Sequence, residues 1–123
     1  MAARILVIDD TQAHLDLFRL ILEAEAYDVQ VASSSFQNAV DIEQLAPDLI
    51  ILDYHLNAQS DEEPLLHKLK AYQPTASIPV IICTADVEAM RNQKDALREQ
   101  GVRVVLKPFD IDDLVFQARQ AMH

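Results

Sequence analysis

The chain has 123 residues, of which half are hydrophobic, and it carries twenty acidic residues against ten Lys and Arg. This length and composition suit one folded domain, taken as residues 1–123, and exclude a disordered chain. The net charge of −10 comes without a basic stripe, which argues against direct nucleic-acid binding. No apolar stretch approaches the roughly 20 residues of a membrane span. We therefore expect a cytoplasmic protein that contacts neither DNA nor membrane.

Short apolar runs predict the strands of a parallel sheet, because strands covered by helices on both faces are nearly continuously hydrophobic. A further strand is predicted at Val29 and Val31. Between the strands, apolar residues recur at helical spacing, as in crossover helices. The predicted fold class is α/β, a (βα)5 doubly wound, five-stranded parallel sheet. The apolar runs are Ile5–Ile8, Leu49–Leu52, Val80–Cys83 and Val104–Leu106.

The first two helices are predicted from caps and apolar spacing. Thr11 is a candidate N-cap for the first helix. The second should follow Ser33–Ser35 and end before Pro47. Their expected inward residues are Leu15, Phe18, Ile21 and Leu22 in the first, and Phe36, Val40 and Ile42 in the second.

The third helix is expected from about Asp61 to Tyr72, with Pro64 in its first turn. Pro74 and Pro79 should mark the loop into the next strand. A fourth helix is predicted between Asp86, as its cap, and Gly101, and Asp110 should cap the fifth. The fifth helix should bury Ile111, Leu114, Val115 and Ala118.

Polar residues stand directly after each of the four apolar runs. In an open parallel sheet the carboxyl ends of the strands form the ligand crevice, so these side chains should meet at one rim. The rim would hold three acids, a hydroxyl and an ammonium group. These residues are Asp9, Asp10, Asp53, Thr84 and Lys107.

This set, in the order Asp-Asp, Asp, Thr-Ala and Lys-Pro-Phe, resembles the motifs of response regulator receiver domains, including the chemotaxis regulators of two-component signalling. The resemblance covers essentially the whole chain. It implies a flavodoxin-like receiver fold and a phosphoprotein of a phosphorelay. The expected partners are a histidine kinase or phosphotransfer protein, and a downstream protein target or a second copy in a homodimer.

The resemblance also implies roles for the rim residues. Asp53 would be the nucleophile that forms an aspartyl phosphate, and Lys107 and Thr84 would bind the phosphoryl oxygens. Mg2+ would be the cofactor, held by Asp10 and Asp53 directly, by Asp9 through water and by the backbone carbonyl of His55. Such a domain would catalyse only its own phosphorylation and dephosphorylation.

Each rim residue also has a simpler interpretation. Asp9 and Asp10 suit a solvated helix cap, Asp53 a turn, Thr84 an N-cap, and Lys107 a surface charge. The histidines His14, His67 and His123 are interpreted as surface residues, because no pair shows metal-ligand spacing. Cys83, inside an apolar run, is expected to be buried and without redox chemistry.

Several alternatives depend on what the chain lacks. Gly101 is the only glycine, which excludes glycine-rich phosphate loops and disfavours a flavin site. Receiver domains usually carry Pro at the position of Asn57, Gly at that of Asp61 and an aromatic residue at that of Val104. The missing ring supports a second hypothesis, a pseudo-receiver that acts as a constitutive protein-interaction module. A phosphatase is weaker, because His55 stands where an acid would be needed.

The expected output face is built from the fourth helix, the fifth strand and the fifth helix. Phosphorylation would shift an equilibrium of this face. A narrow stripe of residues at helical spacing on the fourth helix could belong to the face or to the core. The stripe contains Val87, Met90, Lys94 and Leu97.

Overall fold

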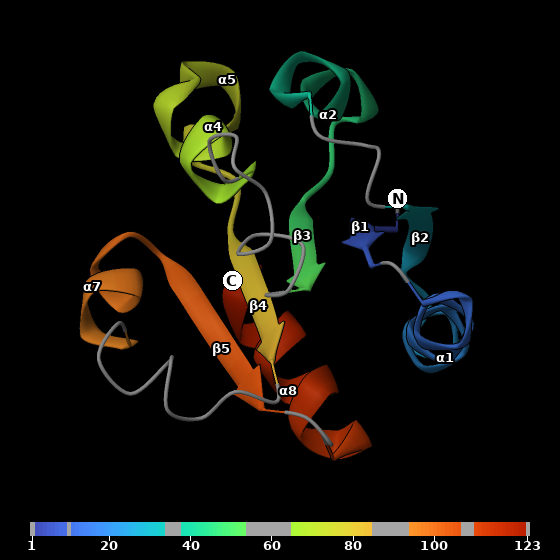
Figure 1. The fold of residues 1–123 in the computed structure, drawn as a ribbon. Helices are drawn as coiled ribbons and strands as arrows, with labels where there is room; N and C mark the ends of the chain where they lie inside the picture. Colours follow the sequence, from blue (N-terminus) through green and yellow to red (C-terminus); the bar gives the residue numbers. More distant parts are fainter. Residues whose placement is uncertain are drawn as a thin grey trace.

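The computed structural model describes residues 2–9, 11–33, 38–53, 65–84, 94–106 and 110–122. Five strands pair in parallel into one sheet of order β2-β1-β3-β4-β5 (Figure 1). This confirms the predicted α/β class and the five-stranded parallel sheet. The strands are β1 Arg4–Ile8, β2 Asp28–Ala32, β3 Leu49–Asp53, β4 Val80–Thr84 and β5 Val102–Leu106.

Helices of the described residues cover both faces of the sheet (Figure 1). The helices α1 and α8 pack on one face, and α2, α4 and α7 pack on the other. The sheet is therefore doubly wound, as predicted. The helices are α1 Gln12–Glu23, α2 Ala39–Leu45, α4 Leu65–Ala71, α5 Gln73–Ala76, α7 Lys94–Glu99 and α8 Ile111–Ala121.

The two faces of the sheet carry separate hydrophobic cores, because successive side chains of a strand point to opposite faces. One core joins the sheet to Phe18 of α1 and Leu114 of α8. The other joins it to Ile42 of α2, Leu69 of α4 and Leu97 of α7. Leu97 of the predicted stripe thus belongs to the core, while Val87 and Met90 lie outside the described residues.

The first helix matches its predicted stripe and its predicted N-cap position. All four expected inward residues of α1 are buried. Thr11 occupies the N-cap position, yet its side chain makes no capping hydrogen bond. Its backbone N–H instead donates to the Asp9 carboxylate, with 2.9 Å between Thr11 N and Asp9 Oδ1. Thr11 is therefore the N-cap residue by position only, whereas the side chain of Asp110 caps α8 by accepting from the Asp112 N–H at 2.8 Å, as expected.

Two residues predicted to face inward are exposed. Val40 of α2 is 44% exposed and Ile111 of α8 is 54% exposed, so both predictions were wrong. Each lies in the first turn of its helix as the structure describes it. Leu114 and Ala118 are buried and Val115 is partly buried against the same core, as predicted. Phe36 lies outside the described residues.

The segment before β4 contains a short helix where a loop was predicted. Pro74 was expected in a loop, but it lies in the first turn of α5, a position that tolerates a residue without an N–H. Thr75 of this helix is buried, and its hydroxyl donates to the Leu69 carbonyl at 2.7 Å. The expected start of the helix at Asp61, with Pro64, lies outside the described residues, as does the Asp86 cap.

Candidate functional site

The pairing of β1 with β3 brings two predicted acids to one edge of the sheet. Ile8 lies opposite Leu52 in the parallel register. Asp9 follows Ile8 and Asp53 follows Leu52, so the two residues occupy corresponding positions at the carboxyl ends of neighbouring strands. Because β3 is the middle strand of the sheet, Asp53 stands at the centre of this edge.

The remaining strands add Thr84 to the same edge. Asp53 lies opposite Cys83 in the pairing of β3 with β4, and Thr84 is the next residue of β4. Thr84 in turn lies opposite Leu106, the last residue of β5. In the sequence, Lys107 comes directly after Leu106. The register therefore brings Asp9, Asp53 and Thr84 to one rim, as the sequence predicted.

Asp9 is buried, with 1% of its surface exposed. Burying a carboxylate costs free energy unless polar groups surround it, and Asp9 has such groups. Its Oδ1 accepts from the Thr11 N–H, and its Oδ2 lies 3.3 Å from His14 Nδ1. The interpretation of Asp9 as a solvated cap is therefore wrong. The beginning of α1 holds this carboxylate in place.

His14 is the rim residue that the sequence interpretation missed. It was expected to be a surface histidine, but its half-exposed ring contacts the Asp9 carboxylate. The available signal was its place in the first turn of a helix that starts just after the Asp-Asp pair. His67 is exposed, as expected, and His123 lies outside the described residues.

Thr84 is fully buried at the end of β4, and the residue before it, Cys83, is buried as well. Burial of Cys83 was predicted. Within the described part of the chain, no buried side-chain nitrogen or oxygen atom lacks a hydrogen-bond partner. The hydroxyl of Thr84 is thus held in a polar setting at the rim.

Other predicted site residues lie outside the described residues. These are Asp10, His55 and Lys107, while Asp53 is described by its backbone. Among the side chains that are described, no three His, Cys, Asp or Glu gather into a possible metal site. The described residues supply one buried carboxylate, Asp9, at the position where the sequence predicts magnesium. The positions of Asn57 and Asp61 are likewise outside this part.

The fold and the rim together define a class of protein: a doubly wound α/β domain whose acids lie at the carboxyl edge of a parallel sheet, where such folds bind their ligands. Residues 5–119 match the response regulator receiver domain family. The chain belongs to this family, whose members are signalling domains of two-component systems.

Relatives and solved structures agree with this assignment. The chain is 34% identical over 116 residues to the DNA-binding dual master transcriptional regulator RpaA of Synechocystis, covering 94% of this chain and 47% of RpaA. It is 30% identical to the transcriptional regulatory protein ZraR of Escherichia coli, covering 96% of this chain and 26% of ZraR. The chain thus spans about half the length of RpaA and about a quarter of ZraR.

Among solved structures, NtrX of Brucella abortus superposes with a TM-score of 0.77 at 30% identity, covering 99% of this chain and 27% of NtrX. The chemotaxis protein CheY4 of Vibrio cholerae gives a TM-score of 0.76 at 17% identity, covering 98% of this chain and 99% of CheY4. The likeness to CheY4 concerns the fold alone. No helix in the described ranges is long and apolar enough to cross a membrane.

Proposed function

We propose that Asp53 of this receiver domain accepts a phosphoryl group from a histidine kinase or a phosphotransfer protein. The observation that carries the proposal is the register that aligns Asp53 with buried Asp9 at the centre of the carboxyl edge. A carboxylate oxygen of Asp53 attacks the phosphorus of the donor. A P–O bond forms, the P–N bond of the phosphohistidine breaks, and the imidazole leaves with the electron pair.

The donor set at this rim fits Mg2+, which prefers carboxylate, carbonyl and water oxygens. Asp10 and Asp53 would bind it directly, the carbonyl of His55 would complete the protein ligands, and Asp9 would act through water. When bound, the ion neutralises charge on the phosphoryl oxygens. The indirect role of Asp9 is supported by its contacts, because each of its oxygens already has a polar neighbour.

Two further residues would act on the phosphoryl group. Lys107 would place its ammonium against the oxygens that carry the negative charge. Thr84 would donate its hydroxyl to a phosphoryl oxygen after transfer. Support for Thr84 comes from its position in β4, one residue beyond the partner of Asp53.

The phosphorylated domain would signal through the face formed by α7, β5 and α8. Three large hydrophobic side chains are exposed on β5 and α8, which suits contact with a downstream protein or a second copy. Phosphorylation would shift the balance between two conformations of this face rather than create a new one. The exposed residues are Leu106, Ile111 and Phe116.

One observation favours a second function, a pseudo-receiver that binds its partner constitutively. Val104 is partly buried against the core that contains α7. It fills the position where receiver domains usually carry the aromatic ring that turns inward on phosphorylation. Valine is β-branched and has few rotamers, so Val104 cannot make the inward rotation that the aromatic ring makes on phosphorylation.

The test is the intact mass of the protein after incubation with acetyl phosphate and Mg2+. The wild-type chain should gain one phosphoryl group, and the gain should vanish with EDTA or with Asp53→Asn. Asp113→Asn is the matched control, because Asp113 is an exposed acid on α8 and should leave the gain unchanged.

The same samples separate the two functions. A gain of mass accompanied by amide NMR shifts in β5 and α8 would support the phosphorylation switch. A gain of mass that is equal in wild type and Asp53→Asn would contradict Asp53 as the acceptor. No gain in any sample would favour the constitutive module.

A further inference from the structure

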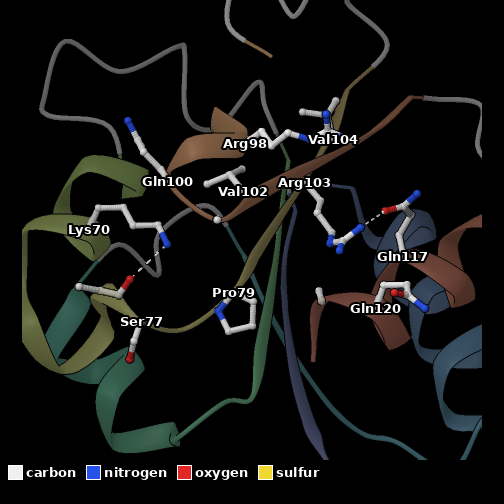
Figure 2. A pocket seen from close by; sticks show the side chains of 13 residues that line it. Lys70, Ser77, Pro79, Arg98, Gln100, Val102, Arg103, Val104, Gln117 and Gln120 are labelled. Atoms are coloured by element: carbon white, nitrogen blue, oxygen red, sulfur yellow. Dashed lines mark hydrogen bonds between the residues drawn. The ribbon is translucent and has the colours of Figure 1, made fainter. Parts of the chain in front are cut away.

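A cleft lies near the amino ends of β4 and β5, the opposite end of these strands from the acidic rim. It encloses about 600 Å3 between the α4–α5 segment, the end of α7, β5 and the end of α8 (Figure 2). Pro79 and Val102, which begin or precede the two strands, line its floor. This cleft was not predicted from the sequence, because its walls come from segments far apart in the chain.

The charges around the cleft differ from those of the whole molecule. Lys70, Arg98 and Arg103 line it, and the described residues that line it include no Asp or Glu. The complete chain has a net charge of −10. Three of ten basic residues are thus collected in one cleft of a strongly acidic protein. An anion would be attracted to the cleft and repelled by much of the remaining surface.

Neutral groups hold two of these cations in place. Lys70 Nζ donates to the carbonyl oxygens of Ala76 at 3.2 Å and Ile78 at 3.4 Å. Arg103 Nη1 donates to Gln117 Oε1 at 3.0 Å. Within the described ranges, none of the three cations forms an ion pair with an acid. Their charges therefore remain available to a ligand.

Lys70 is the cation most affected by its surroundings. Partial burial lowers the pKa of its ammonium group, because desolvation disfavours the charged form. A negative group placed beside Lys70 would offset that cost. The side chain thus gains more from an anionic neighbour than a fully solvated lysine would.

The arrangement of the cations indicates an extended ligand. They come from three elements, α4, α7 and β5, and the charged ends of Lys70 and Arg103 point to different parts of the cleft (Figure 2). A single phosphate is bound best by donors that converge on it, and these do not. In addition, β5 is an edge strand, and its residues Val102–Val104 border the cleft. An edge strand offers backbone groups to an extended peptide.

We infer that this cleft binds an extended acidic peptide segment of a partner protein. Carboxylates of the segment would contact Arg98, Arg103 and Lys70 in turn, and its backbone would lie along β5. The inference deepens the proposed function, because α7, β5 and α8 also form the proposed output face. Binding to the cleft does not itself require phosphorylation.

The test is fluorescence anisotropy with a fluorescein-labelled octapeptide of alternating Glu and Ser, compared with the same peptide carrying Gln for Glu. Only the Glu peptide should bind, and more weakly as salt increases. The combined Arg98→Gln and Arg103→Gln variant should weaken binding at least about tenfold, as expected when two charge-assisted contacts are lost. Amide NMR shifts should fall on residues 98–104 and 117–121.

The matched control is the combined Arg4→Gln and Arg19→Gln variant, which removes the same charge from β1 and α1, toward the opposite edge of the sheet from β5. It should change the dissociation constant by about twofold or less, since distant surface charges are screened. Arg98→Gln alone provides a milder second variant, because Arg98 is exposed and its loss should leave the fold intact.

Several outcomes would overturn the inference. These are equal binding of the Glu and Gln peptides, equal losses in the cleft and control variants, displacement of the peptide by millimolar phosphate at constant ionic strength, or self-association through the cleft. Peptide binding is measured on unphosphorylated protein, and phosphorylation is measured by mass. Failure of the cleft and failure of the Asp53 switch are therefore distinguishable.

Discussion

At the scale of single residues, Tyr72 links two helices that are distant in sequence. Its hydroxyl donates to Glu43 Oε1 at 2.7 Å, which ties the end of α4 to α2. The pKa of Tyr72 is raised above its ordinary value of 10.0. The hydrogen bond to Glu43 is the largest cause, followed by desolvation and by the negative charge of Glu43. The protonated phenol is therefore favoured in the folded state. The resulting stabilisation is complete below about pH 10 and is lost as the pH rises through the folded-state pKa.

This linkage predicts the behaviour of Tyr72→Phe. The wild type should be more stable than the variant at pH 8, and the difference should shrink above about pH 10 as the wild-type phenol ionises. Urea unfolding followed by circular dichroism at a series of pH values measures the difference. Glu43→Gln keeps a hydrogen-bond acceptor but removes the negative charge, so the effect of Tyr72→Phe on stability should depend less on pH in the Glu43→Gln background. Parallel pH curves for wild type and Tyr72→Phe would contradict the argument.

Asp9 shows what residue type alone predicts. An acid after an apolar strand indicated a place at the rim, and the structure confirms that place. The sequence did not predict that the carboxylate is buried between the Thr11 N–H and the His14 ring. Those contacts depend on the direction in which α1 leaves the strand, which no local pattern specifies.

At the scale of elements, three helices are followed by a residue in the left-handed conformation. Ala26 follows α1 with φ of 69°, Ala46 follows α2 with φ of 51°, and Gly101 follows α7 with φ of 78°. Only Gly101 adopts this conformation without a steric cost from Cβ. The only glycine of the chain thus stands where a helix must end, as its position in the sequence predicted.

Reciprocal substitutions test this interpretation. Gly101→Ala should lower the free energy of unfolding by about 1 kcal/mol through backbone strain alone, since an added Cβ would meet no atom within 4 Å. Ala46→Gly should raise it by about 0.5–1 kcal/mol. The control Ala13→Gly, inside α1, should be destabilising by about 1 kcal/mol. The argument would be contradicted if urea unfolding showed that Ala46→Gly and Ala13→Gly change the free energy of unfolding in the same direction.

At the scale of the whole molecule, stability depends on a sheet that is buried on both faces. Leu114 is fully buried in the core between α1, α8 and the sheet, whereas Phe116 on the same helix is exposed. Leu114→Ala should therefore cost about 2–5 kcal/mol, because it leaves a cavity that the packed sheet cannot fill.

Phe116→Ala is the matched control on α8. It should change the free energy of unfolding by no more than about 0.5 kcal/mol, as expected for an exposed position. Both values come from urea denaturation monitored by circular dichroism. A loss at Phe116 as large as that at Leu114 would mean that the outer face of α8 is packed against another part of the protein or a second copy.

The residue pattern was enough to predict five parallel strands, the class of the fold and the position of Asp9, Asp53 and Thr84 at the carboxyl rim. These features are local, because a buried strand must be apolar along its length and a polar residue can follow only where it ends. Local pattern failed for Val40 and Ile111, because helical spacing predicts which face of a helix a residue occupies and not whether another element covers that face.

Tertiary structure alone decided the strand order, the helices that cover each face, the Asp9 contact with His14 and the basic cleft of Lys70, Arg98 and Arg103. Each depends on segments that are far apart in the chain and meet only when the sheet assembles. Their contacts follow from packing two cores around one twisted sheet, and the periodicity of a single segment does not specify how the segments pack against one another.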